Sequence, residues 1–162
     1  MADVTEHGST DVSAPFEPRL AWRGGGVAGL VATAAMGIGI TLVELSTLRV
    51  VIAGLYGLEG SLVAGWLAHL AHGTVFGVLF AAVLADPGLH RVTEWRWKTT
   101  VAGVVYALVL AVVGAGIVMP IWLGAVGFTT PPSIPNVTVP LLVWHLLYGL
   151  VLGALFPSVA DA

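Results

Sequence analysis

The chain contains no cysteine among its 162 residues and has few charged side chains. Without cysteine there can be no disulfide, thiolate nucleophile, iron–sulfur cluster or thiolate zinc site, so any metal would need histidine or carboxylate ligands. Charged residues make up 9% of the chain, against roughly 25% in soluble domains. The formal net charge of −3 and the lack of basic patches give no reason to expect nucleic acid as a partner. This composition argues against a water-soluble monomer.

In place of charge, the chain has long apolar runs, and 57% of its residues are hydrophobic. A helix needs about 20 apolar residues to cross about 30 Å of hydrocarbon. Apart from tyrosine, the ionisable side chains inside the long runs are Glu44 and three histidines. The sequence therefore predicts an all-α integral membrane protein, a four-helix bundle in a lipid bilayer. The four predicted spans are residues 25–44, 62–85, 99–121 and 138–159.

Three segments outside the spans have a character of their own. Residues 1–18 lack the basic and then apolar order of a signal peptide, and they predict a flexible acidic tail before a membrane domain at 19–162. The first outer connection, residues 46–60, is apolar enough to form a short helix on the surface or re-entering the bundle. The second, residues 127–140, is rich in proline, so we expect it to be irregular.

The basic residues predict the orientation. An even number of spans places both termini and the middle connection on one side of the membrane. Five of the six basic residues lie on that side, and by the positive-inside rule they predict a multi-pass protein of the cell membrane with cytoplasmic N- and C-termini. These five are Arg19, Arg23, Arg91, Arg96 and Lys98.

An internal repeat relates the two halves of the chain. At an offset of 76, the segment HLAHGTVFGVLF at 69–80 matches HLLYGLVLGALF at 145–156 with seven identities in twelve. At an offset of 74, GGVAGLVA at 25–32 matches TTVAGVVY at 99–106 more weakly. The repeated unit is a two-span hairpin, so the two copies cross the membrane in the same sense, as a parallel repeat. The second and fourth spans should then run parallel.

The paired segments WLAH…G…FG and WH…YG…LG, separated by a span that ends in Met119-Pro120, resemble those of uncharacterised small four-span membrane proteins of archaea and bacteria. The resemblance covers about residues 25–158. It implies the four-span fold but no established reaction, so no catalytic residue follows from it. His72 departs from the repeat, because Tyr148 stands at the equivalent position of the second copy.

Histidines inside a membrane span are costly and should face the protein interior with a partner. His69 and His145 occupy equivalent positions and share helix faces with Gly73 and Gly149, so we expect both at one depth, pointing toward the bundle axis. The glycine pairs that follow them have GxxxG spacing, which permits close approach of helix backbones. One interpretation is structural, with neutral imidazoles bonded to each other, to Tyr148 or Tyr106, or to threonine and backbone groups.

Two further interpretations use these residues as ligands. In one, His69 and His145 are axial ligands of a b-type haem, with Gly73, Gly149 and Tyr148 lining the porphyrin site. A porphyrin holds helices apart while glycine faces favour contact, so this arrangement requires helices that splay. In the other, the copper or zinc ligands are His69, His72 and His145, with Met36 or Met119 nearby.

No nucleophile, base and acid set is visible along the chain, so an enzyme is not expected. We expect a small non-enzymatic accessory subunit of a larger, respiratory or other, membrane complex, held by other subunits or by self-association. Its cofactor is haem b if His69 and His145 act as ligands, and otherwise it has none. The alternative is an oligomeric transporter or channel with a histidine-lined path. A third interpretation, a quinone or lipid-binding module, would use aromatic residues such as Trp66, Phe76 and Trp144.

Overall fold

The computed structural model describes residues 18–160, which form helices and connections without a β-strand. The predicted acidic tail lies outside the described residues, apart from Pro18, with which the first helix begins. In chain order the elements are α1 (Pro18–Val43), the π-helical η1 (Thr47–Ile52), α2 (Leu62–Leu84), the 3-10 helix η2 (His90–Glu94), α3 (Arg96–Val109), the π-helical η3 (Leu110–Val118), α4 (Met119–Ala125) and α5 (Val139–Ala160).

Four helical spans are long and apolar enough to cross a membrane, as the sequence predicts. Two of them follow the predicted bounds closely, while the first helix begins earlier than expected. The third span is longer than predicted, because α3, η3 and α4 form one continuous helix of 30 residues, Arg96–Ala125. The chain is therefore a multi-pass, all-helical membrane protein.

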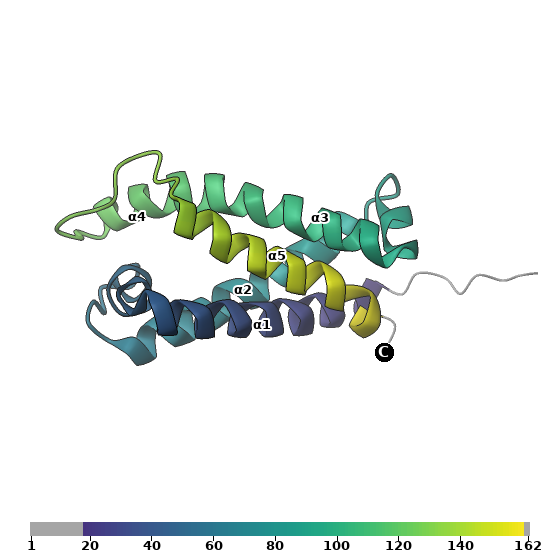
Figure 1. Cartoon of the computed structure of the whole chain (residues 1–162), viewed down its shortest axis with the longest axis horizontal. Coiled ribbons are helices and arrows are strands. Elements are labelled where there is room, and N and C mark those ends of the chain that lie inside the picture. Colours follow the sequence, from purple (N-terminus) through teal and green to yellow (C-terminus); the bar gives the residue numbers. More distant parts are fainter. Residues whose placement is uncertain (1–17, 161–162) are drawn as a thin grey trace, which may run out of the picture.

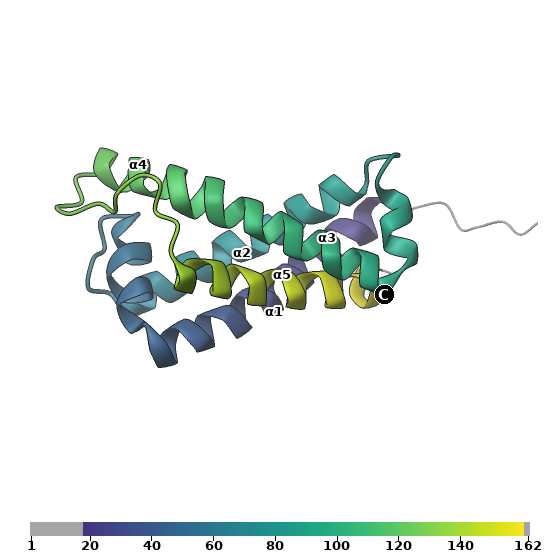
Figure 2. The same cartoon turned by 45° about the horizontal axis from the view of Figure 1, so that its top comes forward.

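The spans form two antiparallel hairpins, α1 with α2 and α3–η3–α4 with α5 (Figure 1). The middle connection with η2 lies at the end of the bundle where α1 begins and α5 ends, which we call the terminal end. Both outer connections lie at the opposite end, so α2 and α5 run in the same direction (Figures 1 and 2). This topology agrees with the predicted parallel repeat of two hairpins.

In the first hairpin, α1 and α2 cross at glycines that bring their backbones into direct contact. A Cβ atom placed on Gly29 of α1 would lie 2.5 Å from the carbonyl oxygen of Gly73 and 2.8 Å from the Cα of Gly77, both on α2. Real Cβ contacts are not this short, so only glycine permits this separation. Such crossings are common in membranes, where packing rather than water drives association.

The second hairpin repeats this contact. A Cβ atom on Gly103 of α3 would lie 2.5 Å from the carbonyl oxygen of Gly149 and 2.8 Å from the Cα of Gly153, both on α5. These are the residues that the sequence repeat aligns with the first crossing, and the distances are the same. The predicted repeat is thus confirmed as a repeat of helix packing, with each GxxxG pair used inside its own hairpin.

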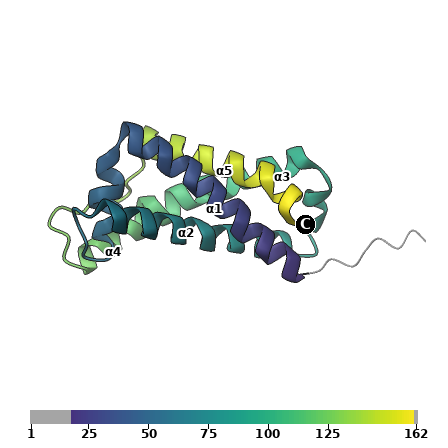
Figure 3. The ribbon, with the colours of Figure 1, turned by 90° about the horizontal axis from the view of Figure 1, so that it is seen from below.

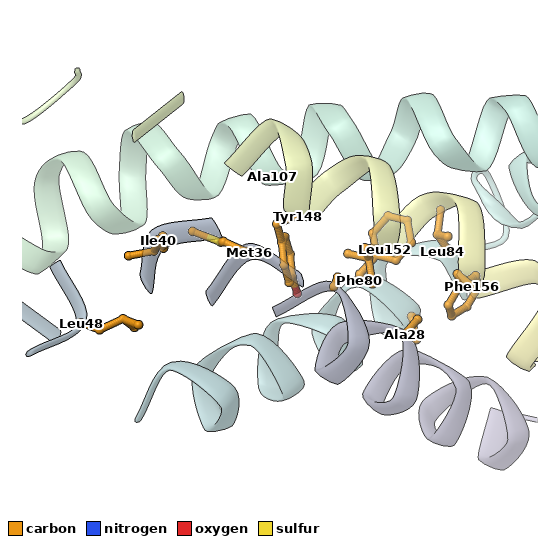
Figure 4. Close-up of a cluster of buried hydrophobic side chains, with 12 residues drawn as sticks. Ala28, Met36, Ile40, Leu48, Phe80, Leu84, Ala107, Tyr148, Leu152 and Phe156 are labelled. Atoms are coloured by element: carbon orange, nitrogen blue, oxygen red, sulfur yellow. The ribbon is translucent and has the colours of Figure 1, made fainter. Parts of the chain in front are cut away.

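The two hairpins join mainly through α1, which runs between α2 and α5 (Figure 3). Buried side chains of α1 at every fourth position meet large side chains of α5, and this contact forms much of the apolar core (Figure 4). By contrast, α2 and α3 do not pack closely along their lengths. The core side chains at this contact are Ala28, Ala32, Met36 and Ile40 of α1 and Tyr148, Leu152 and Phe156 of α5.

The first outer connection contains a helix that folds back against the bundle, as predicted. In η1, Leu48 is fully buried and its carbonyl group lies against Gly65 of α2. The connection also joins the hairpins, since the Trp122 indole nitrogen of α4 donates a hydrogen bond of 2.9 Å to the carbonyl oxygen of Leu55. The irregular second connection is tied down where the Asn136 amide donates to the carbonyl oxygen of Gly116 in η3.

Candidate functional site

His69 of α2 is the most deeply buried of the span histidines, with 6% of its surface exposed. Its ring lies against Gly37 of α1, where a Cβ atom would come within 3.0 Å of the imidazole Cδ2. The indole of Trp66, one turn earlier on α2, meets the ring edge-on at 6.3 Å between centroids. His69 therefore faces the protein interior, but it faces α1 rather than the second hairpin.

The Nε2 atom of His69 is buried and has no hydrogen-bond partner among residues 18–160. Buried polar atoms are nearly always paired, because an unpaired one forfeits its hydrogen bonds to water. The buried side chains of Thr33, Thr99 and Tyr148, by contrast, donate to backbone carbonyl groups. The Nε2 atom of His69 is thus the position in the described core where a water molecule or a polar ligand group would gain a bond.

His72 lies one turn further along α2 and has a different environment. Its Nε2 is 2.7 Å from the hydroxyl oxygen of Tyr56, which belongs to the first outer connection, and the two rings stack at 5.8 Å between centroids. The hydrogen bond ties the connection to α2. The structure accounts for His72 by this contact.

His145 of α5 is half-buried and bonds within its own helix. Its Nδ1 lies 2.8 Å from the carbonyl oxygen of Leu141, and because a carbonyl oxygen only accepts, Nδ1 carries the proton. Tyr148, one turn later, is buried and donates a hydrogen bond of 2.9 Å to the carbonyl oxygen of Gly73. This bond links α5 directly to α2 beside the first glycine crossing.

Tyr106 of α3 makes a second bond of the same kind. Its hydroxyl group donates to the carbonyl oxygen of Phe76 on α2 at 2.9 Å, and its ring lies 5.4 Å from that of Phe80. From the sequence we considered Tyr106 only as a hydrogen-bond partner for a histidine. The signal that could have revealed its importance is its alignment with Ala32 in the repeat, where a small residue is replaced by a large one.

The structure does not gather the predicted metal ligands. Among residues 18–160, no three histidine, aspartate or glutamate side chains converge on a point that could hold a metal ion. His72 is hydrogen-bonded to Tyr56, and the Nδ1 of His145 is hydrogen-bonded to the carbonyl oxygen of Leu141. His69 alone keeps a buried ring nitrogen without a partner among the described residues.

The predicted haem site has ligand chemistry but lacks space in this arrangement. The haem hypothesis needs room beside Gly73 and Gly149. Thr33 of α1 covers Gly73, and a Cβ atom on Gly149 would lie 2.8 Å from the Cβ of Ala107. A porphyrin between His69 and His145 would require these helix contacts to separate, so the residues present do not fit it here.

Fold and interior together define a four-span membrane protein built from two repeated hairpins, with a buried histidine and two tyrosines that cap backbone carbonyl groups between the hairpins. Comparisons of the chain with protein-family models, with curated proteins and with solved structures found no match. The resemblance to small four-span proteins of archaea and bacteria therefore stays a prediction.

Proposed function

We propose that this chain is a non-enzymatic accessory subunit of the cell membrane that packs against another membrane protein through the outer part of its third span. The partner is a subunit of a larger complex or a second copy of the chain. The basic residues at the terminal end support an orientation with both termini in the cytoplasm.

The observation that carries this proposal is the exposure of the third span. In the most apolar stretch of Arg96–Ala125, 22% of the residues are buried, compared with 39% in each of the first two spans. Large side chains along η3, such as Val112, Val113 and Val118, are exposed. This span is thus the part of the bundle least covered by its own chain.

Gly114, in the middle of η3, marks a place on this span that another helix could approach closely. A Cβ atom on Gly114 would meet nothing within 4 Å, whereas the glycines at both hairpin crossings are pressed against backbone. Small residues allow membrane helices to approach each other, and π-helical turns are frequent at functional sites. An unpacked glycine in such a turn therefore supports contact with a partner helix.

A photo-reactive benzoylphenylalanine at Val113 tests the proposal in native membranes, with the same residue at Leu42 of α1 as the control, because both side chains are exposed. We expect a discrete crosslinked protein band from position 113 and none from position 42. The mass of the band distinguishes a second copy from another subunit. Lipid adducts alone at both positions would contradict the proposal.

Substitution of the same glycine separates partner contact from folding. Gly114→Leu should abolish the crosslink from position 113 and leave the purified protein folded, because the chain itself has space for the side chain. Gly103→Leu is the matched control and should unfold the protein, since it fills a backbone crossing. If Gly114→Leu keeps the full crosslink, the glycine has no part in the contact.

The unpartnered Nε2 of His69 favours a second candidate, an oligomeric transporter or channel with a histidine-lined path. A polar atom in the apolar interior could receive a water molecule or an ion from such a path. Flux of ions or small polar solutes into liposomes, lost in His69→Phe, would support this candidate over the accessory role.

The haem hypothesis is tested separately by the visible spectrum of the purified protein. Because α1 and α3 fill the space beside the glycines, we expect no Soret band from the folded protein. A Soret band that is lost in both His69→Ala and His145→Ala would restore haem b as the cofactor and would show that the helices separate to admit it.

A further inference from the structure

The repeat makes the contact between α1 and α5 equivalent to that between α3 and α2, yet only the first is closed. Ala28 and Ala32 of α1 are fully buried in the core that this helix forms with α5. Their equivalents on α3, at the offset of 74, are Ala102 and Tyr106. A phenol ring thus replaces a methyl group at the centre of the second contact.

Tyr106 holds α2 and α3 apart on this side of the bundle. Its ring packs on Phe80 and its hydroxyl group is bonded to the backbone of α2, so the side chain spans the gap between the helices. A side chain of this length keeps the two backbones further apart than alanine does in the equivalent contact. The sequence difference at one repeat position therefore leaves a groove.

The groove lies between α2 and α3 at the terminal end and has a volume of about 440 Å³. Its walls are almost wholly apolar, and Lys98 is the charged residue among the described side chains that line it. Its walls include Val83 and Leu84 of α2, Leu89 and Val92 of the middle connection, and Val101 and Val105 of α3.

Lys98 lies where the groove reaches the end of the bundle, in the first turn of α3. Its ammonium nitrogen is 5.1 Å from the ring centroid of Trp95 and 5.7 Å from that of Trp97. Tryptophan prefers the level of the lipid headgroups, so these contacts place the positive charge at that level. The groove thus has apolar walls along its length and a positive charge at the end that lies at the level of the lipid headgroups.

We propose that this groove binds an anionic lipid of the surrounding membrane, with one hydrocarbon chain between α2 and α3 and the headgroup phosphate beside Lys98. An apolar surface of this shape suits a hydrocarbon chain, and the charge selects a negative headgroup over a zwitterionic one. The lipid fills the space between α2 and α3, whereas the equivalent helices α1 and α5 contact each other directly. This inference is independent of the partner proposed for the third span.

Native mass spectrometry of the detergent-purified protein tests this inference, with phosphatidylglycerol and phosphatidylcholine of identical chains as the probes. We expect the wild-type protein to retain phosphatidylglycerol more strongly. Lys98→Gln should weaken that binding about fivefold, which corresponds to the contribution of one basic residue to binding at an anionic membrane surface. It should leave the binding of phosphatidylcholine unchanged. Arg91→Gln, which removes an exposed charge outside the groove lining, is the matched control.

Filling the groove tests the hydrocarbon chain. Val105 is 57% exposed at the groove, and Val31 is its repeat equivalent on α1 and is 44% exposed. Val105→Trp should abolish retention of the tightly bound lipid, while Val31→Trp should not. Equal retention of both lipids by the wild-type protein, unchanged binding in Lys98→Gln, or equal losses in the two tryptophan variants would each overturn the proposal.

Discussion

Gly77 and Gly153 hold equivalent places in the two hairpins, and each is pressed against the backbone of the neighbouring helix. A Cβ atom on Gly77 would collide with the carbonyl group of Gly25, and one on Gly153 would lie 2.5 Å from the carbonyl oxygen of Thr99. Backbone atoms cannot move aside as the end of a side chain can. The absence of a side chain at Gly77 and Gly153 therefore sets the distance between the two helices of each hairpin.

Gly77→Ala and Gly153→Ala should each lower the free energy of unfolding by about 1–3 kcal/mol, the usual cost of overpacking. Gly114→Ala, where the structure leaves open space, should change it little. Reversible unfolding in mixed detergent micelles measures all three. A loss in Gly114→Ala as large as that in Gly77→Ala would contradict the crossings as the cause, because alanine itself favours a helix more than glycine does.

At the scale of elements, α1 joins the two hairpins, because one of its faces packs on α2 and the neighbouring face packs on α5. Small residues at every fourth position from Gly25 to Gly37 face α2, and the face from Ala28 to Ile40 packs in the core with α5. Close to the terminal end, a Cβ atom on Gly24 would lie 2.6 Å from the Cα of Ala160. Loss of α1 packing would therefore separate the hairpins.

The absence of native cysteine allows a direct test of this arrangement. The double variant Gly24→Cys with Ala160→Cys should form a disulfide on mild oxidation, because a Cβ atom on Gly24 would lie 2.6 Å from the Cα of Ala160 and only a small separation of the two helix ends makes room for the bond. Gly26→Cys with Ala160→Cys is the control, since Gly26 faces Val78 of α2. Faster migration on a non-reducing gel reports the bond. Equal crosslinking of both pairs would indicate mobile helix ends, and crosslinking of the control alone would contradict the packing.

The whole molecule is asymmetric in two ways. Five of its six basic residues lie at the terminal end, and the contact between α2 and α3 is open where its repeat equivalent between α1 and α5 is closed. The charge asymmetry orients a protein during insertion, because basic segments near the spans resist translocation. The side of the bundle formed by α2 and α3 therefore has a groove, while the equivalent side formed by α1 and α5 is closely packed.

Labelling of single cysteines in intact cells checks the orientation. Ser133→Cys in the second outer connection should react with a membrane-impermeant maleimide, because we expect that connection outside the cytoplasm. Gly88→Cys in the middle connection should react only after the cells are permeabilised. Both residues are exposed, so accessibility on the folded protein does not differ. The reverse pattern would contradict the predicted orientation.

The sequence by itself determined the number of spans, their approximate bounds, the folded-back helix of the first outer connection and the hairpin repeat. These features depend on local hydropathy and on identities such as His69 with His145, which need no knowledge of neighbours. The greater length of the third span was missed because its ends are less apolar than its centre. The orientation and the function stay predictions.

Only the tertiary structure decided which surfaces meet. The GxxxG spacing of Gly73 and Gly77 indicates a face for close packing but not whether α1 or α5 occupies it, because lipid and protein are equally apolar and hydropathy cannot tell them apart. For the same reason, the sequence placed His69 in the interior without revealing that it faces Gly37 of α1. Tyr106 could be aligned with Ala32, yet the groove that it opens depends on distances between helices, which packing of the whole chain sets.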